Sequence, residues 1–76
     1  MEKEYIPLNQ LGQLIKILYM EDYKEHLLIY DLSDEKSVRE RLEKMTLKQY
    51  NYFLALFFNK RWFLIKDLLD KFLTHK

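Results

Sequence analysis

Apolar residues recur at helical spacing over the first part of the chain. Leucine and isoleucine stand at positions 8, 11, 14, 15 and 18, with Asn, Gln and Lys between them. This spacing predicts an amphipathic helix over residues 7–20, with Pro7 in the first turn, where a missing N–H costs nothing. Ile17 is an outlier that falls among the polar positions. Gly12, inside the helix, suggests that another backbone packs close to it.

The middle of the chain has a weaker pattern, and its elements are predicted from capping signals. Asp22, followed three residues later by Glu25, resembles a capping box and predicts the start of a second helix. The apolar residues among positions 26–32 form no clean helical stripe, so a short strand is one alternative. A helix is nevertheless expected there, because a single strand without a partner is not stable. Ser33 is then expected to cap a surface helix over residues 34–44.

The clearest local signal is Thr46-Leu-Lys-Gln49, in which each end residue can bond the other's backbone N–H. It predicts a helix that begins here and ends at Asn59, because Asn tolerates the left-handed conformation. A last helix is expected over residues 61–74. The apolar spacing also continues through Asn59, so one long helix over residues 46–74 is an alternative.

Together these elements predict an all-α fold, a small bundle of four to five short helices. The C-terminal helical hairpin, or the one long helix, is expected to form most of the core. With 76 residues, 49% of them hydrophobic, and a net charge of +1, the chain fits a single domain over residues 1–76. Such a chain is too apolar for intrinsic disorder. It contains no cysteine, which excludes disulfides and thiolate metal sites.

No constellation of residues points to catalysis. One glycine and no cysteine exclude glycine-rich phosphate loops and cysteine nucleophiles. Asp22 and His26 stand four residues apart, but a metal site needs three or four ligands, so we interpret this pair as part of a charged helix face. We therefore expect no enzymatic activity, no metal and no cofactor.

Apolar surface in the C-terminal part exceeds what the core of a monomer needs. On a helical wheel, Tyr52 and Leu56 fall opposite the broad apolar face of their helix, and Phe63 projects among polar residues of the next one. Charge is uneven as well, because residues 1–44 carry a net −3 and residues 45–76 a net +4. The predicted partner-binding residues combine both features: Tyr52, Leu56, Phe63, Lys60, Arg61 and Lys66.

These features favour a small protein-binding regulator or inhibitor that self-associates, as a homodimer, through its C-terminal helices. Small phage- or plasmid-encoded proteins fit this profile, and the charged N-terminus without an apolar leader predicts a cytoplasmic location. One alternative is a DNA-binding regulator of the helix-turn-helix type that uses residues 46–74, although the low net charge disfavours nucleic acid. Another alternative is a membrane-associated immunity-type protein, without a transmembrane segment, that uses its basic C-terminal helix.

Overall fold

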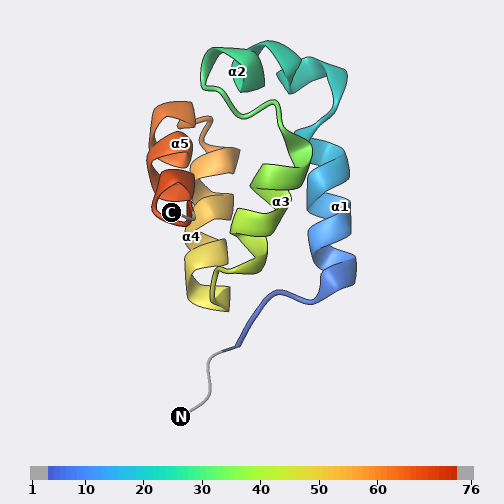
Figure 1. Ribbon diagram of the computed structural model, residues 1–76, viewed down its shortest axis with the longest axis vertical. Helices are drawn as coiled ribbons and strands as arrows, with labels where there is room; N and C mark the ends of the chain where they lie inside the picture. Colours follow the sequence, from blue (N-terminus) through green and yellow to red (C-terminus); the bar gives the residue numbers. More distant parts are fainter. Residues whose placement is uncertain (1–3, 74–76) are drawn as a thin grey trace.

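The computed structural model describes residues 4–73, and all regular structure in this range is helical (Figure 1). The all-α prediction is therefore confirmed. An isolated antiparallel bridge joins Tyr5 to Thr46, and the Leu47 N–H donates to the Glu4 carbonyl at 2.7 Å. The elements are α1 (Leu8–Leu18), the 3-10 helix η1 (Glu21–Tyr23), α2 (Lys24–Ile29), α3 (Glu35–Glu43), α4 (Leu47–Phe58) and α5 (Trp62–Asp70).

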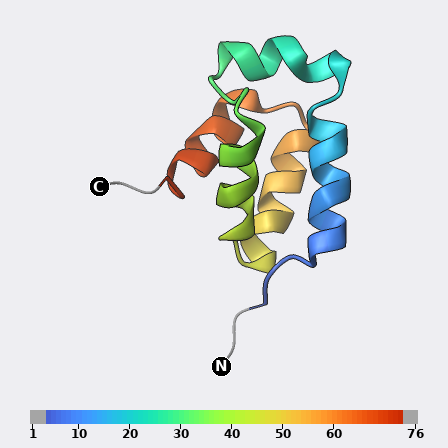
Figure 2. The same ribbon diagram turned by 45° about the vertical axis from the view of Figure 1, so that its right-hand side comes forward.

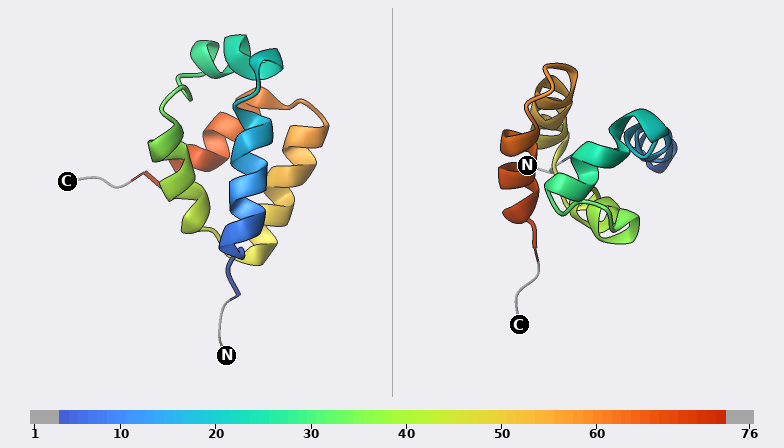
Figure 3. Two further views of the ribbon diagram at one scale, coloured as in Figure 1. Left: turned by 90° about the vertical axis from the view of Figure 1, so that its right-hand side faces the viewer. Right: turned by 90° about the horizontal axis from the view of Figure 1, so that it is seen from above.

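Helices α1, α3 and α4 stand side by side, and η1 and α2 lie across one end of this group (Figures 1 and 2). Seen from the side of α1, this helix lies in front, with α3 on one flank and α4 on the other (Figure 3). The colours of Figure 1 show that α1 and α4 run in the same direction and that α3 runs in the opposite one. Helix α5 folds back beside α4 and also contacts α3.

The core is shared by all five α-helices instead of being concentrated in the C-terminal pair. Of 18 buried apolar side chains in the described part of the chain, α4 and α5 supply eight, fewer than half. The expectation that this pair forms most of the core is wrong, because α1 buries a full stripe and the connecting segments add Ile6, Leu32 and Met45. The α1 stripe consists of Leu11, Leu14, Ile15 and Leu18.

The start of α4 follows the local sequence signal. The Thr46 hydroxyl accepts a hydrogen bond from the Gln49 N–H at 3.3 Å, and the Gln49 side-chain oxygen accepts one from the Thr46 N–H at 2.9 Å. Met45 and Tyr50, which flank the cap, are both buried. The predicted capping box is therefore confirmed, and it satisfies two N–H groups that the first helical turn leaves without partners.

The caps predicted for the middle of the chain are wrong. Neither η1 nor α2 has a side-chain cap, so Asp22 and Glu25 form no capping box. The residue that caps α3 is Asp34, whose carboxylate accepts from the Ser37 N–H at 3.3 Å, not the Ser33 hydroxyl. Either Ser or Asp can cap a helix, so composition alone does not choose between neighbouring candidates. The helix expected for residues 26–32 is confirmed as far as Ile29.

Helix α4 ends in a tight turn, and this excludes one long C-terminal helix. The Arg61 N–H donates to the Leu56 carbonyl at 2.9 Å and the Lys60 N–H to the Phe57 carbonyl at 3.0 Å, the bonds of a Schellman motif. The left-handed residue is Lys60, with φ 56°, while Asn59 has φ −93°. Asn59 acts differently from the prediction, since its side-chain amide donates to the Ala55 carbonyl at 2.7 Å.

A buried arginine links α3 to α5. Arg41 is 8% exposed, and its Nη2 donates to the Ser37 hydroxyl at 2.9 Å. Its Nη1 lies 3.6 Å from Asp70 Oδ1, which Lys66 also approaches to 3.1 Å. Because the cation and the carboxylate stand on different helices, this pair connects α3 to α5.

Candidate protein-binding surface

An apolar groove runs between α1 and α4, where the two helices lie side by side. Its volume is about 260 Å³. Buried Leu14, Tyr50 and Phe57 form the floor. Ile17, Leu54 and Phe58 form the walls, and the amides of Gln10 and Gln13 complete the lining. We call this feature the α1–α4 groove.

The walls of the groove expose large apolar side chains. Phe58 is 71% exposed and Ile17 is 46% exposed, while Leu54 is half-buried. Each exposed residue directly neighbours a buried one, Phe57 in α4 and Leu18 in α1. Successive residues turn by about 100° around a helix, so a side chain next to a core residue can point away from the core. Phe58 and Ile17 therefore both lie at the opening of the α1–α4 groove.

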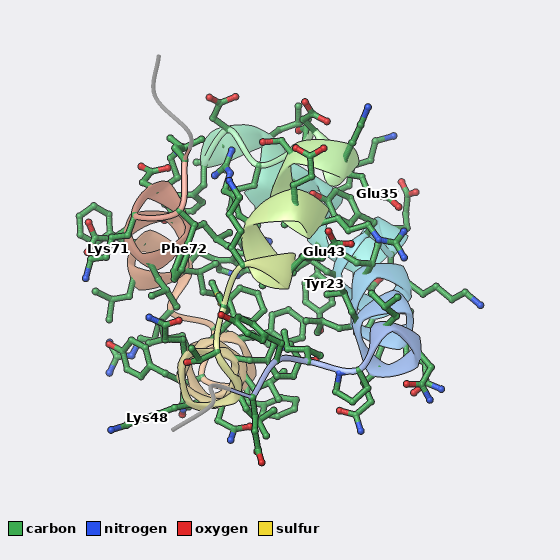
Figure 4. The ribbon with its side chains drawn as sticks, turned by 60° about the horizontal axis from the view of Figure 1, so that its bottom comes forward. Tyr23, Glu35, Glu43, Lys48, Lys71 and Phe72 are labelled. Atoms are coloured by element: carbon green, nitrogen blue, oxygen red, sulfur yellow. The ribbon has the colours of Figure 1, made fainter. Side chains whose placement is uncertain are left out.

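Within residues 4–73, no charged side chain lines the α1–α4 groove. Its polar groups are two glutamine amides and the Tyr50 hydroxyl, and burial raises the pKa of that hydroxyl, so it stays neutral at physiological pH. Two basic side chains of the C-terminal half, Lys48 and Lys71, project outward from α4 and α5 on the side away from α1 (Figure 4). An uncharged apolar groove favours an uncharged apolar ligand surface.

The predicted partner-binding residues of α4 and α5 have different positions. Tyr52 is 53% exposed and Phe63 is 71% exposed, so both are accessible. Leu56 is only 7% exposed, and its predicted place on an outer face is wrong. The reason is that α5 folds back against α4, so a side of α4 that a wheel assigns to solvent becomes part of the core.

Two of the three predicted basic residues are engaged within the molecule. The Lys60 ammonium donates to the Tyr23 hydroxyl at 3.1 Å and lies 4.8 Å from the Tyr23 ring centre and 4.9 Å from that of Phe57. Lys66 pairs with Asp70 in the next turn of α5. Arg61 is exposed. The ammonium groups of Lys60 and Lys66 therefore already interact with other groups of the same molecule.

The histidine that raised the question of a metal ligand is part of an aromatic cluster. His26 stacks on buried Trp62 with ring centres 5.2 Å apart and an interplanar angle of 16°. Trp62 also meets Phe57 edge-on at 5.9 Å, and Tyr23 lies 5.8 Å away. Across residues 4–73, no three His, Cys, Asp or Glu side chains gather to hold a metal ion. This cluster joins the start of α2 to the turn between α4 and α5.

A second, larger hollow is less suited to a specific ligand. It has a volume of about 380 Å³ and lies between η1, α2 and the start of α3. Its lining mixes Glu21 and Glu35 with Lys24 and the exposed Leu28. The Tyr19 hydroxyl beside it already donates to the Leu32 carbonyl at 2.7 Å. Mixed charge at an open surface is well solvated without a ligand, so we place the candidate site at the α1–α4 groove.

Sequence reasoning missed the residues that form the walls of this groove. Leu54 and Phe58 belong to the broad apolar face of their helix, and this face was assigned to the core as a whole. The available signal was Ile17, an apolar residue on the polar side of the first helix. One such residue is ordinary at a protein surface. It gains meaning only when the fold places Phe58 opposite it.

The chain matches no protein-family model, no curated protein and no solved structure. None of the helices within residues 4–73 combines the length and the apolar character needed to cross a membrane.

Proposed function

We propose that the protein is a protein-binding module whose recognition surface is the α1–α4 groove. The observation that carries this proposal is the 71% exposed ring of Phe58 beside an apolar floor, in a groove whose lining residues, among those the structure describes, are all uncharged. Exposed apolar surface around a hollow is a common property of protein-interaction sites. A binding role without catalytic groups suits a regulator or inhibitor that acts by occupying a surface of its target.

The dimensions of the groove fit a short helix. Its lining spans Gln10 to Ile17 on α1 and Tyr50 to Phe58 on α4, so at 1.5 Å per residue it is about 11–12 Å long. This length equals about two turns of an α-helix, which present two or three apolar side chains to one face. A helix laid in an apolar groove is a frequent recognition mode, with anchors at i, i+3 or i+4, and i+7.

The proposal is tested by selecting helical peptides from a displayed library against the purified protein. The affinity of each selected peptide is then measured on Phe58→Gln and on Phe63→Gln. These variants form a matched pair, because both phenylalanines are 71% exposed and only Phe58 lines the groove. Glutamine adds no charge and therefore does not interact differently with the two helix ends.

We expect Phe58→Gln to weaken peptide binding at least tenfold, as for other aromatic anchors, and Phe63→Gln to leave it unchanged. The free energy of unfolding of each variant should lie within about 0.5 kcal/mol of that of the original protein, because neither side chain is buried. Peptides that bind all three proteins equally would contradict the proposal. Loss of binding on Phe63→Gln alone would move the recognition surface to the outer face of α5, near the partner-binding residues predicted from the sequence.

A further inference from the structure

We infer that the segment bound in the α1–α4 groove is a short amphipathic helix whose apolar face lies in the groove and whose flanks carry acidic residues. The observation that carries this inference is that the two helices of the groove come from the two longest stretches of the chain without Asp or Glu. The inference rests on the proposed function, because it states the chemistry of the partner that binds the same surface.

Acidic residues are distributed unevenly along the chain. Residues 21–43 hold eight of the twelve Asp and Glu residues and four Lys and Arg residues. Residues 5–20 and 44–66, on either side, hold no Asp or Glu and six basic residues: Lys16, Lys44, Lys48, Lys60, Arg61 and Lys66. The fold brings these two acid-free stretches together, because α1 and α4 lie side by side (Figures 1 and 2). The only charged side chains on the two helices of the groove are therefore basic.

The acidic residues of the neighbouring elements belong to other surfaces. Glu21, Asp22 and Glu25, in η1 and α2, line a separate hollow of about 310 Å³ together with Lys24 and Leu28. Helix α3, which carries three more glutamates, lies on the flank of α1 opposite α4 (Figure 3). Among the described residues, no carboxylate lines the groove itself. Like-charge repulsion therefore acts against a basic partner segment here and not against an acidic one.

Two exposed cations stand close to the groove, one on the α1 side and one on the α4 side. Lys16 follows Gln13 by three residues, so it is a neighbour on the helix surface of a residue that lines the groove. Arg61 follows Phe58 by three residues, in the turn after α4. Lys48 projects from α4 on the side away from α1, so it acts on a partner only over a longer distance (Figure 4). Each flank of a bound helix therefore has a cation on its side.

The ends of α1 and α4 favour the same sign of charge on the partner. The two helices run in the same direction, so their positive ends lie together, and neither helix has an acidic residue in its first turn. At the opposite end, Lys16 stands in the last turn of α1, and Lys60 and Arg61 follow α4, so basic residues compensate the negative helix ends. Negative charge on the partner is therefore favoured where the helices begin and is not repelled where they end.

A helix fits this surface better than other anionic partners do. The floor of the groove consists of buried Leu14, Tyr50 and Phe57, and it is recessed between two helices. A helix presents apolar side chains that enter such a groove. Nucleic acid presents phosphates, which give the exposed ring of Phe58 no apolar contact. A bilayer is a broad surface that takes up protruding apolar side chains and leaves a recessed floor uncovered.

The first test is the composition of the peptides selected for the groove. The displayed library keeps apolar anchors at i, i+4 and i+7 and randomises the flanking positions among Glu, Gln and Lys. Peptides that lose affinity on Phe58→Gln should carry Glu on their flanks at least about threefold more often than Lys. Equal use of Glu and Lys would overturn the inference and leave the proposed function intact, since only dependence on Phe58 tests the latter. A library without any Phe58-dependent peptide would contradict both.

The second test measures the charge dependence directly. Three peptides with the same anchors and with Glu, Gln or Lys on their flanks are titrated by fluorescence anisotropy. The Glu peptide should bind about tenfold more tightly than the Lys peptide at low salt, with a smaller ratio at about 1 M salt. Lys16→Gln should weaken the Glu peptide about threefold and leave the Gln peptide unchanged.

Lys36→Gln is the matched control, because it removes the same charge from an exposed position on α3. It should leave the affinity for the Glu peptide unchanged. Equal losses for Lys16→Gln and Lys36→Gln would show that the net charge of the chain, not the groove, attracts the peptide, and would overturn the inference. Displacement of the Glu peptide by duplex DNA, or by vesicles that contain phosphatidylserine, would assign the surface to that partner and overturn it too.

Discussion

Two turns of this protein share one backbone pattern and differ in what stabilises them. At the end of α2, the Leu32 N–H donates to the Leu27 carbonyl at 2.7 Å and the Asp31 N–H donates to the Leu28 carbonyl at 3.2 Å. Helix α4 ends with the same two kinds of backbone hydrogen bond, in the turn that contains Lys60. The left-handed residues are Asp31, with φ 57°, and Lys60, with φ 56°. Glycine usually occupies such a position, and neither turn has one. Something other than backbone freedom therefore holds each turn.

The first turn is held by the core. Leu32 and Leu27, which the 2.7 Å backbone hydrogen bond joins, are both buried, and the Tyr19 hydroxyl donates to the Leu32 carbonyl. In the second turn the equivalent of Leu32 is Arg61, which is exposed, and the turn is supported instead by the Lys60 ammonium against Tyr23. The comparison indicates that a left-handed turn without glycine persists when one side chain of the turn is anchored, and that the anchor can be apolar, as for Leu32, or cationic, as for Lys60.

The strongest way to break this comparison is to remove the apolar anchor. Leu32→Ala deletes a side chain that is 2% exposed, so we expect it to lower the free energy of unfolding by about 2–5 kcal/mol. Arg61→Ala, at the equivalent position of the second turn, should change it by less than about 0.5 kcal/mol, because that side chain is exposed. Urea unfolding followed by circular dichroism measures both. Equal losses would show that the two turns are stabilised in the same way.

The second prediction concerns the hydroxyl that bonds the first turn. Tyr19→Phe removes the donor to Leu32 and should cost about 1 kcal/mol at neutral pH. Burial raises the pKa of Tyr19 above its usual value of 10.0, and the nearby carboxylates of Glu35 and Asp34 add to the shift. The folded protein therefore holds this proton more tightly than the unfolded chain does.

The sign of the pH dependence follows from this shift. The contribution of Tyr19 to stability is complete below the unfolded pKa of about 10 and is lost as the pH rises toward the higher folded pKa. The original protein should lose stability between about pH 9 and 11 more steeply than Tyr19→Phe does. Tyr50 also has a pKa raised by burial, so Tyr50→Phe is a useful parallel. Identical slopes for the original protein and Tyr19→Phe would contradict the assignment.

The same contrast shows what sequence reasoning can reach. The capping box of Thr46 and Gln49 was predictable because both partners lie within one turn of chain. The left-handed Lys60 was not, since Asn59 is locally the better candidate and the contact of Lys60 with Tyr23 joins residues 37 positions apart. The amphipathic helices and the all-α class likewise follow from local spacing.

The candidate site was out of reach for the same reason. A helical wheel orders the side chains around one helix, but it does not say which sides the other helices cover. Leu56 is buried because α5 returns along α4, and Phe58 is exposed because it lines the open groove between α1 and α4. Ile17 signals one wall of this groove, and nothing in the spacing pairs it with Phe58.

A third prediction concerns how much stability a glycine costs at a helical position whose backbone conformation does not require glycine. Gly12, the chain's one glycine, stands inside α1 with an ordinary φ, and a Cβ built there meets no atom within 4 Å. The close backbone approach expected from the sequence is therefore absent. Gly12→Ala should raise the free energy of unfolding by about 0.5–1 kcal/mol, because alanine loses less backbone entropy on folding. A decrease would indicate a constraint on α1 other than packing at this position.

The smallest and sharpest test introduces glycine at both left-handed positions. Asp31→Gly relieves the left-handed backbone without touching the Leu32 anchor, so we expect a gain of up to about 1 kcal/mol. Lys60→Gly gives the same relief but removes the ammonium from the rings of Tyr23 and Phe57, a contact worth about 0.5–1 kcal/mol. The second variant should therefore change stability little. If both variants gained equally in urea unfolding, the cation would not support the second turn; a larger gain at Asp31 would confirm that it does.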